Sequence, residues 1–411
     1  LRSRGLGDVY KRQLMQKRNL LIIILFLFTG TIGWSAERIR QNFDFDWQFR
    51  LGEQGIYKPV QLPHDWSIEL DFNEEVGPES GYLPGGIGYY KKDFNVPASY
   101  KGKRVSIVFD GIYHKATIYL NGQEVDYHRY GYTSFETDLT PYLKYGGKNT
   151  LSVKVDHSEK SRWYTGSGIY RHVWMQVTNP IHVKMWGTYI TTPRVSAESA
   201  IVSCVTTVAN TSALTGEIEI MQRIVDAQGN LLKINGKQYA ARTEVVMPEN
   251  GTKDIAQSFT LSNPQLWNLE KPYLYRLETI LKQKGKVIDR YTTRFGVRTI
   301  GFDKDKGFFL NGKNIKMKGA CLHQDAGCLG VAVPNRSYER RLTILKEFGA
   351  NAIRCSHNPP SPEFLNYCDS IGFLVVDEAF DKWKSGYYEQ FFDECWQQDI
   401  RDMIVRDRNH P

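Results

Sequence analysis

Hydrophobic and polar residues alternate in short runs between residues 37 and 180, as at 104–109, 116–120 and 150–155. A period of two buries one face of a strand and exposes the other. Asn121-Gly122 separates two such runs and is a typical two-residue hairpin turn of the primed type. No helical period is sustained in this stretch, so we predict a jelly-roll β-sandwich for residues 37–180.

A second series of alternating runs begins after Asn179-Pro180. About seven strands fit into about 120 residues, which is typical of an immunoglobulin-like β-sandwich, and we predict one for residues 181–299. The clearest strands of this series are expected at 200–205, 216–221 and 273–278, with turns at 226–230 and at Asn235-Gly236.

The pattern changes at about residue 300, where short apolar segments alternate with amphipathic helical ones. This alternation predicts parallel strands joined by helices. A (β/α)8 TIM barrel needs about 250 residues, whereas residues 300–411 number 112, so we predict an incomplete barrel with its first three strands. Strands are expected at 315–321, 350–354 and 373–377, and helices at 337–348 and 362–370, the second capped by Ser361 with Pro362 in its first turn.

An apolar run of 14 residues at 20–33 follows basic residues and precedes small ones. This is the pattern of a secretory signal peptide, and the run is shorter than the ~20 residues of a membrane span. We therefore predict a signal peptide at 15–36 and a secreted or periplasmic protein without membrane contact after cleavage; an uncleaved anchor is the alternative. Residues 1–14 precede Met15 without a pattern and are expected to be an artefactual leader.

The formal net charge of +8 is concentrated near the start of the chain. The first 36 residues hold six basic side chains and one acidic one, which leaves +3 for residues 37–411. That balance is ordinary for a surface of this size, so nucleic-acid binding is set aside. Aromatic residues make up 13% of the chain, which suits β-rich domains and also sugar binding, where ring faces cover the apolar side of a pyranose.

The cysteines match no zinc-binding spacing, and six in a chain of this length do not form a disulfide framework. We expect reduced, buried thiols, and Cys321 with Cys328 is the one pair considered for a disulfide. The six are Cys204, Cys321, Cys328, Cys355, Cys368 and Cys395.

Polar residues follow each of the three predicted barrel strands. His323 and Asp325 follow the first, Arg354 and His357 end the second, and Asp377-Glu378 ends the third. The carboxyl ends of parallel barrel strands form the working face, so this coincidence favours function, although a single histidine at a strand end is more often structural. The sequence contains no Gly-rich phosphate loop and no histidine pair with helical metal-ligand spacing.

Several segments together resemble glycoside hydrolase family 2, in chain order from about residue 37 to 411, and within it the β-galactosidases. Those of the predicted barrel read KGACLHQDAG (318–327), AIRCSHNPP (352–360), FLVVDEA (373–379) and RDRNHP (406–411). Those of the two predicted sandwiches read LPHDW (62–66), SRWYTGSGIYRHVW (161–174) and LWNLEKPYLY (266–275).

The resemblance implies a jelly-roll sugar-binding domain, an immunoglobulin-like domain and a barrel that hydrolyses terminal β-linked sugars with retention. Retention uses two carboxylates, a nucleophile and an acid/base. In the family the acid/base Glu follows RDRNHP by about ten residues and the nucleophile lies on a later strand, so we expect both beyond Pro411 and expect the chain alone to be inactive. Glu378 is set aside as the acid, because it aligns with a different family Glu.

The resemblance also implies roles for residues that the chain contains. His323 and His357 are expected to bind hydroxyls of the sugar that is cleaved off, and Arg354 resembles the arginine that contacts the nucleophile. Asp156 matches a first-domain Asp that reaches the sugar, with a turn Asp before Ser158 as the alternative. Asp325 is expected to face the substrate.

Some family β-galactosidases bind Mg²⁺ through a Glu-x-His motif just after the third strand. Here the matching residues are Lys382 and Lys384, and an ammonium group does not ligate a cation, so no metal and no cofactor are expected. The His-x-Asp-Ala pattern at 323–326 keeps β-glucuronidase as the alternative. A non-catalytic carbohydrate-binding protein and a membrane-anchored interaction protein are the rivals from other classes. A homo-oligomer is compatible with the sequence.

Overall fold

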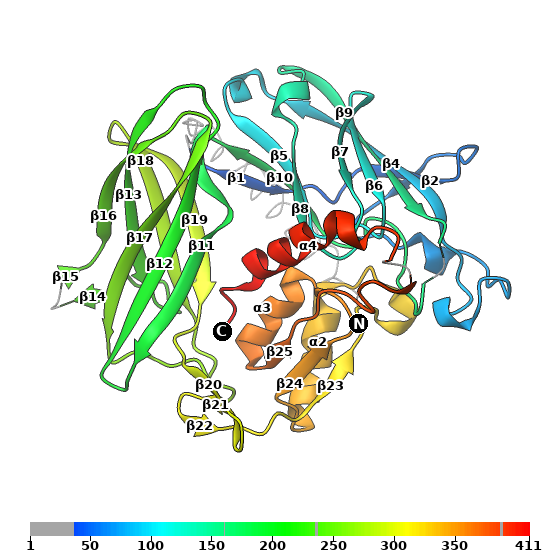
Figure 1. The fold of residues 1–411 in the computed structure, drawn as a ribbon. Coiled ribbons are helices and arrows are strands. Elements are labelled where there is room, and N and C mark those ends of the chain that lie inside the picture. The colour runs from blue at the N-terminus through cyan, green and yellow to red at the C-terminus, as the bar shows by residue number, and fades with distance from the viewer. Residues whose placement is uncertain (1–36, 160, 235–236, 387–388) are drawn as a thin grey trace, which may run out of the picture. The chain divides into compact units, whose positions relative to one another are not determined.

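The computed structural model describes residues 37–411 apart from 160, 235–236 and 387–388. Figure 1 shows antiparallel sheets in the first two thirds of this stretch, followed by a segment of mixed helices and strands. The predicted leader at 1–14, signal peptide at 15–36 and turn at 235–236 lie outside the described residues. No helix within the described residues is long and apolar enough to span a membrane.

The first sandwich consists, among the described residues, of a six-stranded and a four-stranded antiparallel sheet, as predicted. Across the six-stranded sheet the order is β3 (Lys58–Val60), β2 (Trp47–Leu51), β4 (Gly86–Val96), β9 (Gly147–His157), β6 (Ala116–Leu120) and β7 (Gln123–His128). Across the four-stranded sheet it is β1 (Ile39–Asn42), β10 (Val173–Thr178), β5 (Arg104–Phe109) and β8 (Phe135–Asp138). Short 3₁₀ helices connect them: η1 (Trp66–Glu69), η2 (Pro78–Ser80), η3 (Ala98–Tyr100) and η4 (Thr140–Tyr142).

Alternation along β9 shows how the sequence builds this sandwich. Leu151, Val153 and Val155 are buried between the two sheets, while the residues between them are half-exposed. The predicted hairpin joins β6 to β7, and Asn121 and Gly122 both have positive φ (54° and 84°), as a primed turn requires. The last residue of β9, His157, is also buried, and its Nδ1 lies 2.6 Å from Ser167 Oγ.

The second sandwich has the seven strands expected of an immunoglobulin-like domain and, within the described residues, a small additional hairpin. The strand predicted at 273–278 begins two residues later than expected, at Tyr275. One sheet has the order β11 (Ile181–Val195), β12 (Ser199–Asn210) and β17 (Gly251–Ser262). The other has the order β16 (Ala241–Met247), β13 (Gly216–Val225), β18 (Tyr275–Gln283) and β19 (Lys286–Phe295). The additional hairpin pairs β14 (Lys233–Ile234) with β15 (Lys237–Gln238).

The segment from residue 300 begins differently from the prediction. A small antiparallel sheet of β20 (Ile300–Asp303), β21 (Gly307–Leu310) and β22 (Lys313–Asn314) comes first. The first parallel strand, β23, spans Gly319–Leu322 instead of 315–321, because its ladder begins only where Gly319 pairs with Ala352.

Three parallel strands follow in the order β23, β24 (Ala352–Cys355) and β25 (Leu374–Val376), as predicted. The helices between them are α2 (Asn335–Glu347) and α3 (Pro362–Ile371), and α4 (Phe392–Asp407) comes after the third strand (Figure 1). A 3₁₀ turn, η5 (Gly327–Leu329), lies after β23. The incomplete barrel therefore contains three parallel strands among the described residues.

The two faces of this parallel sheet differ in their surroundings. Ile353 and Cys355 of β24 pack with side chains of α2 and α3 in a buried cluster. Cys321, Arg354 and Val376 lie side by side in the strand register and are all exposed. We call the face that carries these three residues the open face.

Local signals fix both ends of α3. Ser361 caps its first turn by accepting a hydrogen bond at Oγ from the Phe364 amide (3.2 Å), as predicted. Gly372 ends it at φ 86°, and a Cβ there would lie 2.4 Å from the carbonyl oxygen of Leu269. Glycine is therefore required twice at this position, for its backbone angle and for its close contact with the preceding domain.

Candidate active site

The carboxyl ends of the three parallel strands bring several of the predicted site residues together. Arg354 lies on β24, His357 follows that strand, and Glu378 follows β25. Arg354 Nε donates to Glu378 Oε1, and the Glu378 Oε2 oxygen lies 2.9 Å from His357 Nδ1. Arg354 Nη2 lies 3.3 Å from the same ring nitrogen. One carboxylate thus contacts both the arginine and a histidine that the sequence singled out.

Arg354 also reaches the neighbouring strand on the open face. Its Nη1 lies 3.7 Å from Cys321 Sγ. The Glu378 carboxylate, followed by Cys321, raises the pKa of the Arg354 guanidinium. The arginine side chain is 47% exposed and that of Glu378 20% exposed, so solvent weakens this ion pair and its contribution to stability is small.

The two histidines are neighbours although 34 positions separate them. The ring centroids of His323 and His357 lie 5.8 Å apart with the rings nearly perpendicular. Trp163, from the first sandwich domain, lies 5.5 Å from His323 and 5.7 Å from His357. Burial, and then the neighbouring His357, lower the pKa of His323, so at neutral pH its ring is uncharged.

Two buried arginines hold the loop that carries His357. Arg171 of the first domain donates from Nη2 to the carbonyl of Pro359 (2.8 Å) and from Nη1 to that of Tyr132 (2.8 Å). Arg406 of α4 donates from Nη2 to the carbonyl of Pro360 (2.7 Å). These bonds fix the backbone immediately after His357 from two sides.

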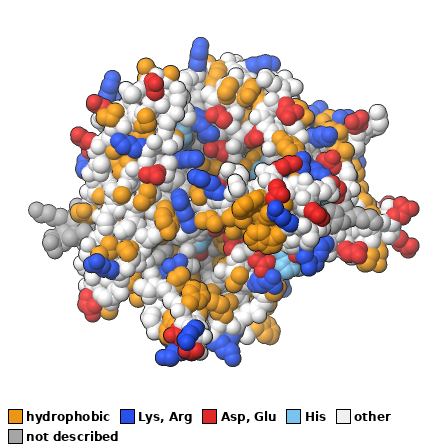
Figure 2. All heavy atoms as spheres, in the orientation of Figure 1, with side chains coloured by type: hydrophobic (Ala, Val, Ile, Leu, Met, Phe, Trp, Pro, Cys, Tyr) orange, Lys and Arg blue, Asp and Glu red, His pale blue; other side chains and the backbone are white. Residues whose placement is uncertain are grey.

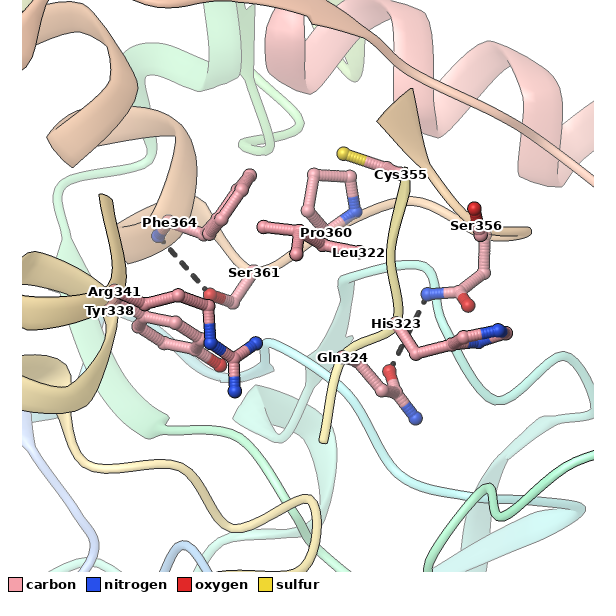
Figure 3. A pocket seen from close by; sticks show the side chains of 11 residues that line it. Leu322, His323, Gln324, Tyr338, Arg341, Cys355, Ser356, Pro360, Ser361 and Phe364 are labelled. Atoms are coloured by element: carbon pink, nitrogen blue, oxygen red, sulfur yellow. Dashed lines mark hydrogen bonds between the residues drawn. The ribbon is translucent and has the colours of Figure 1, made fainter. Parts of the chain in front are cut away.

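A small pocket lies beside the strand ends, and Figure 3 shows His323, Gln324 and Ser356 among the side chains that line it. Gln324 Nε2 donates to the carbonyl of Thr165 (3.1 Å), and Asn358 Nδ2 donates to Gln324 Oε1 (3.4 Å). These bonds tie the loops after β23 and β24 to each other and to the first domain.

The other two predicted substrate-facing residues have local partners. Asp325 Oδ2 accepts from the Gly327 amide (3.2 Å), and Arg341 donates to the Asp325 carbonyl (2.7 Å). Asp156 lies at the end of β9, where its carboxylate accepts from the amide (3.0 Å) and Oγ (2.5 Å) of Ser158. Within the described residues the Asp156 side chain makes no hydrogen bond to the barrel segment, so its geometry matches the turn alternative.

The stretch at 381–384, which aligns with the magnesium motif of some family members, forms ion pairs with nearby protein side chains. Asp381 pairs with Arg162, and Lys384 lies 2.6 Å from Asp393. The part of the chain that the structure describes holds no group of three or more His, Cys, Asp or Glu side chains that could bind a metal ion.

A carboxyl pair lies beneath the site. Burial, and then the neighbouring Asp407, raise the pKa of Asp377 to about 7. Arg406 binds Asp407 through Nε and Nη2, both at 2.7 Å, and donates from Nη1 to Ser134 Oγ (3.1 Å). Arg406 therefore offsets negative charge under β25 while it joins α4 to the first domain.

All six cysteines are free. Cys204, Cys355 and Cys368 are buried as expected, but Cys321 and Cys328 are exposed, so the expectation of burial is wrong for these two. Cys321 is exposed because it lies on the open face of the sheet, which no helix covers in the part of the chain that the structure describes.

Sequence reasoning did not single out Trp163 or Gln324 as parts of this arrangement, and it placed Glu378 only at the end of the third strand, without a partner. Trp163 lies within the quoted 161–174 segment, but only the fold brings it to the histidines. Glu378 was considered as a catalytic acid, and no sequence signal connects it with His357.

Three family models match consecutive parts of the chain. The sugar binding domain of glycosyl hydrolases family 2 matches residues 44–180, a second model of glycosyl hydrolases family 2 matches 181–298, and the TIM barrel domain of that family matches 303–411. The chain belongs to glycosyl hydrolase family 2. The sandwich, immunoglobulin-like and barrel architecture is that of the family.

Relatives of this family 2 chain include enzymes named for two activities. The β-galactosidase BoGH2A of Bacteroides ovatus is 44% identical over 92% of this chain and 46% of its own length. A putative β-glucuronidase of Formosa agariphila is 36% identical over 100% of this chain and 40% of its own. The chain thus spans about half the length, or less, of these curated relatives.

Solved structures of the family have the same fold. A family 2 glycosyl hydrolase from Bacteroides cellulosilyticus superposes with a TM-score of 0.86 at 40% identity, over 90% of this chain and 50% of that one. A β-glycosidase from Bacteroides vulgatus superposes with a TM-score of 0.83 at 36% identity, over 91% of this chain and 49% of that one.

Proposed function

We propose that the whole protein to which this chain contributes is a retaining β-glycosidase that removes a terminal β-linked sugar. The observation that carries this proposal is the cluster of Arg354, His357, Glu378 and His323 at the carboxyl ends of adjacent parallel strands, in a domain of a glycosidase family. Polar groups at this end of a barrel are where its enzymes bind and convert substrates.

Each residue has a proposed part in the reaction. His323 and His357 bind hydroxyls of the sugar, and Trp163 supplies an aromatic surface beside them. The Arg354 guanidinium, whose Nε is taken by Glu378, keeps Nη donors on the open face that can hold an ionised nucleophile. The nucleophile and the acid/base, which retention requires about 5–5.5 Å apart, come from barrel strands other than β23–β25. Asp325 and Asp156 are also proposed to contact the substrate, with less support than the two histidines.

A β-galactoside is the preferred substrate and a β-glucuronide the second candidate. The first is supported by the 44% identity to a protein named β-galactosidase, and the second by the 36% identity to one named putative β-glucuronidase. The His-x-Asp-Ala pattern at 323–326 also supports the second.

The test compares nitrophenyl β-galactoside with nitrophenyl β-glucuronide on the full-length protein. We expect higher kcat/KM for the galactoside, with the β-anomer of the sugar released first. The 411-residue chain alone should give no turnover above a buffer blank. A full-length protein that hydrolyses neither glycoside yet is retained on immobilised sugar would replace this proposal with the carbohydrate-binding alternative.

We also propose that the protein is exported, on the sequence of residues 15–36 alone. Exported material should begin near Glu37. Mass spectrometry that finds residues 20–33 intact in exported protein would contradict this.

A further inference from the structure

His357 Nδ1 has two neighbours with opposite hydrogen-bonding character. Glu378 Oε2 lies 2.9 Å away and Arg354 Nη2 lies 3.3 Å away. An ionised carboxylate only accepts hydrogen bonds and a guanidinium only donates them, so one ring nitrogen can satisfy only one of the two. The carboxylate contact is the shorter and is charge-assisted when the nitrogen donates. A proton on Nδ1 is therefore the arrangement that fits the site.

The same carboxylate also holds the arginine. Arg354 Nε donates to Glu378 Oε1, so each oxygen of Glu378 has one partner. The ion pair is partly exposed and adds little to stability, which leaves orientation as the main effect of Glu378. Its carboxylate fixes which nitrogen of His357 carries the proton and which nitrogens of Arg354 remain available.

We infer that Glu378 is a positioning residue that holds His357 as its Nδ1–H tautomer and so makes Nε2 a hydrogen-bond acceptor for a substrate hydroxyl. This inference rests on the proposed glycosidase function and deepens it. Among the described residues, His357 Nε2 makes no hydrogen bond, so it is available to a ligand. The sugar group that faces it is a hydroxyl, which can donate, and not a carboxylate, which cannot.

The inference is tested on the full-length protein with ¹⁵N-labelled histidines, which include the nine of this chain. Nitrogen NMR across a pH series separates protonated from unprotonated ring nitrogens at its alkaline limit, and the His357→Gln variant assigns the His357 signals. We expect at least a roughly tenfold excess of the Nδ1–H tautomer, as hydrogen bonds to charged groups usually give. Glu378→Ala should abolish this excess.

Two further variants complete the design. Glu378→Gln keeps the volume and an acceptor oxygen but loses the charge, so the tautomer excess should fall several-fold without disappearing. Glu339→Gln on α2 removes a carboxylate that pairs with Arg336 (2.6 Å) and no histidine, and should leave the His357 spectrum unchanged.

A parent chain with His357 mainly as the Nε2–H tautomer would overturn the inference without any variant. So would an unchanged spectrum in folded Glu378→Ala or Glu378→Gln. Because the readout is a ring nitrogen and not turnover, this failure would leave the proposed glycosidase activity standing. An inactive full-length protein with the expected tautomer would contradict only the proposed function.

Discussion

Arginines serve two different purposes in neighbouring parts of this molecule. At the junction of the first domain and the barrel segment, Arg171 and Arg406 are 3% and 8% exposed and donate to backbone carbonyls of the loop after β24. On the open face, the Arg354 side chain is 47% exposed and its only charged partner among the described residues is Glu378.

This difference separates the arginines that support the fold from the arginine that is free to take part in binding. At the junction, each buried arginine has oxygen partners within the protein, so removing one leaves polar atoms unpaired in a dry environment. On the open face, donors and acceptors remain available, so removing one costs little folding energy and changes what can bind. Figure 2 shows basic, acidic and hydrophobic side chains interspersed on the face it draws, so sign of charge alone does not distinguish the two regions.

The largest effect is expected from the junction. Arg406→Met should lower stability by about 3–5 kcal/mol, because it leaves Asp407 and Asp377 without their buried cation. Chemical denaturation and melting temperature of the 411-residue chain measure this. Arg401→Met, on an exposed position of the same helix, is the matched control and should stay within about 0.5 kcal/mol of the parent. Equal losses of stability in the two variants would show that the buried arginine supports the fold no more than an exposed one does.

The histidines at the strand ends should behave in the opposite way in the full-length protein. His323→Ala and His357→Ala should each cost roughly 2–4 kcal/mol of transition-state stabilisation, seen in kcat/KM, with little change in melting temperature. His182→Ala is the control: His182 is buried beside the carbonyls of Asn179 and Pro180, so this variant should lose stability and keep its kinetics. Near-normal kinetics with a large loss of melting temperature in the first two would mean that these histidines are structural.

The parts of the fold that local sequence determines were predictable. Ser361, Pro362 and Gly372 delimit α3 because caps act on adjacent backbone, and Asn121-Gly122 determines its own turn. The start of β23 was not predictable, since residues 315–318 have strand-like sequence and only the ladder to Ala352 sets where pairing begins.

The site was likewise predictable only where it follows from local sequence and strand order. Parallel strands end at one edge, which is why His323 and His357 could be expected to converge from their positions alone. The contacts of Trp163 and Glu378 depend on tertiary packing between distant segments, and no local pattern encodes them. The exposure of Cys321 depends likewise on which face of β23 the helices cover.

A smaller effect is expected from Asp377, whose pKa is raised to about 7, mainly by burial. The native state keeps a proton that the unfolded chain loses near an ordinary value of 3.8, so the associated stability is present at acidic pH and is lost as pH rises toward 7. Asp377→Asn should therefore gain melting temperature relative to the parent between pH 5 and pH 8, by a few degrees. A difference between variant and parent that does not change with pH would contradict the raised pKa.

The smallest effect concerns the cysteines and leaves stability unchanged. Cys321 and Cys355 lie one residue apart in the register of adjacent strands, on opposite faces of the sheet, so an aromatic disulfide reagent should separate the two faces. Cys321 and Cys328 should react quickly in the folded 411-residue chain. Burial raises the pKa of Cys355 and also that of Cys395, the latter to about 12 from an ordinary 9, which lowers its thiolate fraction roughly a thousandfold.

Two fast thiols are therefore expected, and Cys321→Ser and Cys328→Ser should each remove one of them while the melting temperature stays constant. Cys355 and Cys368 should react only on unfolding, because Cys355 packs in a buried cluster with side chains of α2 and α3, and Cys368 lies on the buried side of α3. A slow Cys321 or a fast Cys355 would mean that the faces of the sheet have been assigned the wrong way round. Arg354, which is adjacent to Cys321 in the register, would then lie on the covered side, and its contrast with the junction arginines would disappear.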